Sequence, residues 1–151
     1  MMALAYVLTG SQEDAQDVVQ TVLARLAGSD LGHVTDMPAY CHRAVTNESA
    51  SWGRVKVRTR RRVEALNSEW IRRHATQPDP YGRIEVMSAL RALPLRQRSA
   101  VVLRYYLDWD DDAIAETLGC APATVRSILS RALKKLRLEL GNDDHEGATT
   151  S

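Results

Sequence analysis

The sequence predicts an all-α protein: two small helical domains joined by a flexible linker, the C-terminal one a helix-turn-helix. Three observations predict this fold. Apolar residues recur at helical spacing, and no segment shows convincing strand-like alternation. Two prolines and a glycine gather within residues 74–82, which is typical of a linker because residues before proline avoid helix. Near the C-terminus, a Gly-x-x-Pro turn at Gly119 separates two amphipathic segments.

Two long helices are expected in the N-terminal half. Ser11 can cap the first, which runs to about Ala27 and carries acidic residues near its positive end. Pro38 opens the second, which runs toward Trp52. The basic segment from Arg54 continues this helix or forms its exit.

Four further helices are expected after the linker. Residues 84–93 show helical spacing, and Pro94 starts the next helix. Asp110 caps the third helix, and Gly119 ends it in the left-handed conformation that glycine tolerates. Pro122 then fits the first turn of the last helix, where its missing N–H costs nothing.

The last helix is apolar on one side and basic on the others. Its apolar stripe is formed by Val125, Leu129, Ala132 and Leu136. A helix that shows short hydroxyls and arginines on its free faces suits the DNA major groove. A solvated helix hairpin is the plainer interpretation, but the turn and the Thr-Val-Arg-Ser opening favour a helix-turn-helix. The candidate DNA-binding residues are Thr124, Arg126, Ser127, Ser130, Arg131, Lys134 and Lys135.

Composition excludes several classes of protein. The 151 residues are 44% hydrophobic and 26% charged, as in a water-soluble protein, and no apolar run approaches the length of a membrane span. The start of the chain is a poor signal peptide. Cys41 and Cys120 lie far apart without metal-ligand spacing, which predicts a reduced, cytoplasmic protein with no metal and no cofactor.

Charge is unevenly distributed although its net value is only +1. Residues 1–48 carry two basic and six acidic groups, a net charge of −4. Residues 54–73 carry eight basic and two acidic groups, a net charge of +6. These blocks indicate an acidic surface that faces a protein and a basic surface that faces a polyanion. The acidic tail, residues 141–151, is expected to be disordered.

Residues 93–140 (LPLRQRSAVVLRYYLDWDDDAIAETLGCAPATVRSILSRALKKLRLEL) resemble region four of extracytoplasmic-function sigma factors. The Asn-Glu-Ser-Ala-Ser-Trp run, residues 47–52, resembles an actinobacterial subgroup of this family in particular. Residues 14–26 (DAQDVVQTVLARL) resemble the region-two segment that docks on RNA polymerase. Residues 38–62 (PAYCHRAVTNESASWGRVKVRTRRR) resemble the part that melts the promoter and reads the −10 element. The matches occur in the family's order over about residues 3–140.

The resemblance implies a promoter-specificity subunit that is not an enzyme. Such a protein binds core RNA polymerase, reads promoter DNA at the −35 and −10 elements, and is held by an anti-sigma factor. It is expected to be cytoplasmic, away from membranes, and monomeric when free. The implied organisation is a region-two-like domain (1–73, short at its N-terminus), a linker (74–83), a region-four-like domain (84–140) and the tail.

The resemblance also implies roles for individual residues. In the last helix, Arg126, Ser127 and Arg131 match positions that contact bases and phosphates. Trp52 could stack on an exposed base, although a packing role is the better interpretation. The candidate −10 residues are Arg43 and Asn47, near the flipped base, with Arg54 and Lys56. The candidate polymerase-binding residues are Asp14, Gln16, Asp17 and Gln20, although acidic residues there could simply complement the helix dipole.

Three departures from the family pattern are expected to matter. Ala121 replaces a capping serine, a loss of about 1 kcal/mol. Ile128 and Leu133 occupy positions often held by arginine, which removes possible phosphate contacts. The chain starts late, because the family has a further helix before this segment. Either the start is mis-assigned or the polymerase-binding domain is incomplete, in which case Val18, Val22 and Leu26 would be partly uncovered.

Two other functions compete with this interpretation. A conventional helix-turn-helix regulator that acts without core polymerase would explain the C-terminal half but leave residues 14–62 unexplained. An enzyme is disfavoured because the sequence has no Gly-rich phosphate loop and its four histidines show no ligand-like pairing. Cys41 and His42 are neighbours in sequence, which does not make a catalytic dyad.

Overall fold

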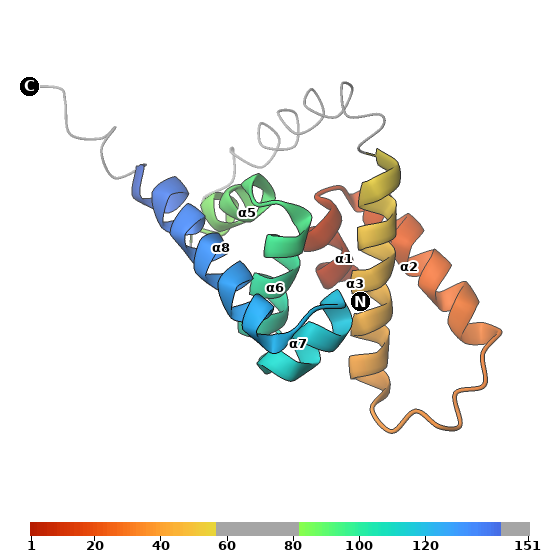
Figure 1. Cartoon of the computed structure of the whole chain (residues 1–151). Coiled ribbons are helices and arrows are strands. Elements are labelled where there is room, and N and C mark those ends of the chain that lie inside the picture. Colours follow the sequence, from red (N-terminus) through yellow and green to blue (C-terminus); the bar gives the residue numbers. More distant parts are fainter. Residues whose placement is uncertain (57–81, 143–151) are drawn as a thin grey trace, which may run out of the picture.

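The computed structural model describes residues 1–56 and 82–142, with side chains for 1–54 and 82–141, and the regular elements of this part of the chain are all α-helices (Figure 1). The all-α prediction is therefore confirmed. Of the predicted linker, 74–83, only Gly82 and Arg83 are described, and Arg83 already begins a helix. Most of the basic block 54–73, and the tail beyond residue 142, lie outside the described residues. The helices are α1 (Met2–Thr9), α2 (Gln12–Ala27), α3 (Met37–Lys56), α5 (Arg83–Ala92), α6 (Leu95–Tyr105), α7 (Asp111–Leu118) and α8 (Pro122–Asn142).

Local capping signals set most helix ends where the sequence predicts them. The Ser11 hydroxyl accepts a hydrogen bond from the Asp14 N–H (3.3 Å), and Asp110 accepts one from the Ala113 N–H (2.8 Å). Gly119 ends α7 with φ +61°, in the left-handed region. The start of α3 differs by one residue from the prediction, because Asp36 accepts a hydrogen bond from the Ala39 N–H (3.0 Å) and caps the helix earlier.

The N-terminal core is covered, contrary to the expectation of exposed apolar positions on α2. Val18 and Val22 are 0% and 1% exposed, and Leu26 is partly buried. The side chains of α1 and α3 cover them, so the expected exposure is wrong for Val18 and Val22. One further member, Val102, comes from α6 in the other half of the chain. The buried apolar residues are Leu4, Ala5, Leu8, Ala15, Val18, Val19, Val22, Val45 and Val102.

The C-terminal core joins α5–α8. The predicted stripe of α8 is buried at Val125, Leu129 and Ala132, with Leu136 packed at its edge. Ile128 is also buried, at 5% exposure. The expectation that an arginine there could contact phosphate is therefore wrong, because the position faces the core.

The two halves pack directly against each other. Figure 1 shows α6 and α7 between α8 and the group formed by α1, α2 and α3, and α3 contacts both α6 and α7. At Gly53 of α3 the helices approach so closely that an added Cβ would lie 2.9 Å from Leu95 Cδ2 of α6. Within the described ranges, no helix combines the length and apolarity needed to cross a bilayer.

Arg98 of α6 joins the ends of two other helices. Its Nη1 donates to the carbonyl of Leu8 at the end of α1 (2.6 Å), and its Nε donates to the carbonyl of Leu90 in α5 (2.9 Å). Its Nη2 donates to the carbonyls of Arg91 (3.0 Å) and Leu93 (3.1 Å). The last carbonyls of a helix lack partners within it and carry partial negative charge, so a guanidinium satisfies them well.

Arg98→Ala should lower the free energy of unfolding by about 3 kcal/mol, because hydrogen bonds to charged groups contribute about 1.5–3 kcal/mol and the carbonyls would lose their donor. Urea unfolding followed by circular dichroism measures the change. Arg96→Ala removes the same charge from an exposed position of α6 and should change stability by about 0.5 kcal/mol or less. Equal effects of the two variants would contradict the role of Arg98.

Candidate nucleic-acid interface

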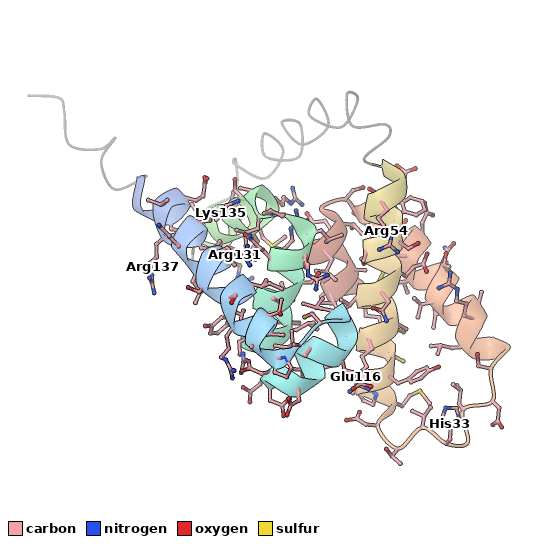
Figure 2. All side chains as sticks on the ribbon, viewed as in Figure 1. His33, Arg54, Glu116, Arg131, Lys135 and Arg137 are labelled. Carbon is pink, nitrogen blue, oxygen red and sulfur yellow. The ribbon has the colours of Figure 1, made fainter. Side chains whose placement is uncertain are left out.

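The predicted DNA-binding side chains of α8 are all exposed, while the stripe on the opposite side is buried. Figure 2 labels Arg131, Lys135 and Arg137 along this helix. Pro122 and the glycine turn at Gly119 set the direction of α8 relative to α7. The arrangement is that of a helix-turn-helix whose second helix presents hydroxyl and basic groups. The exposed residues are Thr124, Arg126, Ser127, Ser130, Arg131, Lys134 and Lys135.

Some of these side chains are already held by neighbours. The Ser127 hydroxyl donates to the carbonyl of Ala123 (3.3 Å), and Arg131 Nε donates to the carbonyl of Ser127 (3.3 Å). Arg126 Nη1 lies 3.3 Å from Asp111 Oδ2, and the other carboxylate oxygen of Asp111 contacts Arg104. No sequence motif indicates these two contacts of Asp111, because Arg126, Asp111 and Arg104 come from α8, α7 and α6.

A second candidate surface is a hollow of about 430 Å³ between α2 and α3. Arg43 and Asn47, two of the predicted −10 residues, line it together, so the structure brings them to one site. Arg25 also lines it, and Arg25 Nη1 forms an ion pair with Glu48 Oε2 (2.5 Å). Sequence reasoning missed Arg25 and Tyr40, although Arg25 is one of two basic residues before position 48. The lining residues are Val22, Arg25, Leu26, Ser29, Tyr40, Arg43, Ala44 and Asn47.

Arg43 connects this hollow to the helix-turn-helix. Its Nη2 lies 3.0 Å from Glu116 Oε2 of α7, and its guanidinium lies over the Trp109 ring, 5.7 Å from the centroid. The side chains of Arg43 and Glu116 are 38% and 66% exposed, so solvent screens this ion pair. Arg43 is therefore shared between the two halves of the protein.

The remaining predicted −10 residues lie toward the end of α3. Arg54 is exposed, while the side chain of Lys56 lies outside the described residues. Trp52 is partly buried and packs against the N-terminal core, which agrees with the packing interpretation. Burial, and to a smaller extent the N-terminal ammonium, lower the pKa of His42, although Asp36 opposes this. His42 is therefore mostly neutral at pH 7, and the positive charge near the hollow comes from arginine.

The predicted polymerase-binding residues of α2 do not all reach the surface. Gln16, Asp17 and Gln20 are exposed, whereas Asp14 is only 8% exposed. A direct contact between the Asp14 carboxylate and a partner is thus disfavoured, since the first turn of α2 packs it inward. Of the four predicted residues, Gln16, Asp17 and Gln20 are therefore the ones that a partner can reach on α2.

The geometry suits binding rather than covalent chemistry. Exposed arginines and lysines can contact phosphates and guanine edges, and an amide such as that of Asn47 offers both a donor and an acceptor to a base. Among the described side chains, no group of three histidine, cysteine or acidic residues gathers as metal ligands would.

Comparisons with known proteins find similar sequences for both halves of the chain. The family model "Sigma-70, region 4" matches residues 83–136. The RNA polymerase sigma-E factor of Streptomyces antibioticus is 36% identical over 138 residues, covering 87% of this chain and 73% of the relative. The ECF RNA polymerase sigma factor SigE of Mycolicibacterium smegmatis is 33% identical over 156 residues, covering 98% and 60%.

Among solved structures, the sigma factor RpoE from Bartonella quintana, in complex with the anti-sigma factor NepR, has a similar fold. Its TM-score is 0.67 and its identity 23%, covering 93% of this chain and 89% of that one. At this identity the likeness supports the fold.

Proposed function

The chain belongs to the extracytoplasmic-function sigma factors of the sigma-70 family, non-catalytic subunits with which RNA polymerase initiates transcription, and we propose how its surfaces divide that work. α8 reads the −35 element, the hollow between α2 and α3 receives a −10 base, and the exposed face of α2 binds core RNA polymerase. The alternative of a regulator that acts without polymerase has no support in the N-terminal half, over which the relatives also align.

The proposed −35 role rests on one observation: seven hydroxyl and basic side chains of α8 are exposed while its apolar stripe is buried. An arginine can bond guanine O6 and N7 with two donors, so Arg126 and Arg131 are the candidate base readers. Lys134 and Lys135, further along the same helix, hold phosphate, which adds affinity without sequence information.

The proposed −10 role rests on the hollow that Arg43 and Asn47 share. A base can enter such a site only after it leaves the duplex, and its edge then meets the Asn47 amide. Arg25 and Arg43 stand at the same hollow and can attract the phosphates on either side of the base. Because Arg43 also contacts Glu116, this contact must be released before Arg43 meets DNA.

The protein-binding partners are core RNA polymerase and an anti-sigma factor. Gln16, Asp17 and Gln20 form an exposed polar face on α2 that can pair with a polymerase surface. RpoE of Bartonella quintana, which shares the fold, forms a complex with an anti-sigma factor. We propose that this chain is likewise held by one in the cytoplasm and is otherwise monomeric when free.

Asp17→Ala should weaken binding to core RNA polymerase by about 1–2 kcal/mol if Asp17 lies at the contact. Glu13→Ala is the matched control, because Glu13 is also acidic and exposed on α2. Competition with a labelled sigma factor for core polymerase measures both affinities. Equal losses would mean that only the overall charge of α2 matters.

Arg131→Ala should reduce discrimination between matched and scrambled −35 elements by about 1–3 kcal/mol. Lys135→Ala should instead weaken binding to both DNAs alike and lower the salt slope by roughly one unit. Salt titrations of holoenzyme binding on the two DNAs separate the effects. If Arg131→Ala weakened binding to both DNAs equally, the base-reading role would be contradicted.

Asn47→Ala should leave closed-complex formation nearly unchanged but reduce strand opening, since its proposed partner is exposed only after melting. Permanganate reactivity of −10 thymines reports opening directly. Ser51→Ala, one turn further along α3, is the control and should open DNA normally. Normal opening by Asn47→Ala would show that Asn47 is simply a surface residue of the helix.

A further inference from the structure

We propose that Asp111 is a positioning residue for −35 reading, whose carboxylate holds the guanidinium of Arg126 in the orientation in which it meets the promoter. This inference rests on the proposed −35 role of α8. Asp111 belongs to α7, outside the recognition helix, and its role would be exerted through Arg126 rather than by contact with a base.

The Asp111 carboxylate uses its two oxygens for two different helices. Oδ1 accepts from Arg104 Nη2 of α6, and Oδ2 accepts from Arg126 Nη1 of α8 at 3.3 Å. The side chains of Asp111 and Arg104 are 24% and 28% exposed, whereas Arg126 is 67% exposed. The carboxylate and Arg104 therefore form the sheltered part of the triad, and Arg126 is its member at the surface.

The position of the carboxylate is fixed independently of Arg126. Asp111 is the first residue of α7, directly after the capping residue Asp110, so its backbone is held by the start of the helix. The positive end of the helix dipole and the Arg104 guanidinium both stabilise a negative charge there. Arg104 belongs to the last turn of α6, and the residue directly before it, Leu103, is fully buried.

A held arginine reads bases better than a free one. An exposed arginine samples many rotamers, so without a fixed neighbour its guanidinium can also form poorly aligned hydrogen bonds with mismatched base pairs. The contact with Oδ2 leaves the other donors of Arg126 available and limits the directions in which they point. Support of a binding side chain by a second, anchored residue is the general way to fix such a geometry.

The charge of Asp111 allows a sharp test, because a positioning role and a purely electrostatic role predict different effects on discrimination between DNA sequences. If Asp111 were only a negative charge near DNA, its removal would strengthen binding to every sequence by reducing repulsion of phosphates. As a positioning residue, its removal lowers the preference for the matched base pair whatever happens to overall affinity.

The test uses holoenzyme assembled with core RNA polymerase and a set of −35 elements, each changed at one base pair. Arg126→Ala first identifies the pair that Arg126 reads. Asp111→Ala is then expected to reduce discrimination at that pair by about three- to tenfold, the range for ordering one long side chain. Binding to scrambled DNA should hold or increase. Asp112→Ala removes the same charge from the adjacent exposed residue and is the control.

A double-mutant cycle isolates the coupling. In the Arg126→Ala background, Asp111→Ala should leave discrimination unchanged, because the residue through which it acts is absent. Asp111→Asn is a second variant for use if Asp111→Ala does not fold. Its side chain keeps one carbonyl oxygen that can accept a hydrogen bond from Arg104. It should show a loss in the same direction.

Two outcomes overturn the proposal: an Asp111 variant that changes binding to matched and changed DNA by the same factor, or a loss of discrimination that persists without Arg126. If the unmodified holoenzyme showed no preference that depends on Arg126, the proposed −35 role of Arg126 itself would fail instead. The two failures are therefore distinguishable.

Discussion

The guanidinium of Arg98 donates hydrogen bonds to the ends of both α1 and α5, and the arrangement of the two halves depends on these bonds. A helix that ends near other protein needs donors for its last carbonyls, and Arg98 supplies them to Leu8, Leu90 and Arg91. Because α6 also carries Val102 into the N-terminal core, the donor and the apolar contact come from one helix. Through Arg98 and Val102, α6 therefore links the position of α1 on α2 to the C-terminal half.

This coupling brings the two candidate DNA surfaces into contact at Arg43. Its guanidinium cannot meet a promoter base while its Nη2 lies 3.0 Å from Glu116 and its face covers Trp109. Both ionic partners are substantially exposed, and exposed pairs contribute about 0–1 kcal/mol. A phosphate or a base edge can therefore replace Glu116 as the partner of Arg43 at little cost in free energy. The ion pair can thus break when the protein binds DNA.

The sequence was sufficient where the signal is local and insufficient where it is not. Ser11, Asp110 and Gly119 each fix a helix end through their own backbone neighbours, so the capping rules predicted them. The burial of Asp14 and Ile128 depends on what packs over α2 and α8, which helical spacing alone did not reveal. Arg25 with Glu48, and Arg126 with Asp111, join residues from different helices, so no motif could indicate them.

The proposed roles of the two halves require that some contacts between them can be exchanged for contacts with DNA and polymerase. In the proposed roles, α8 and the hollow beside Asn47 meet different stretches of DNA, because the −35 and −10 elements are separate targets. Polar contacts between the halves include Arg98 with Leu8, Arg91 with Tyr6 and Arg43 with Glu116, and at Gly53 α3 approaches α6 at a position without a side chain. Contacts between domains of one chain resemble transient interfaces, which exchange one partner for another. Binding to polymerase and DNA can then replace contacts that the free protein makes between its two halves. The hydrogen bond from Arg98 to Leu8 must then either break or persist while α1 moves together with α6.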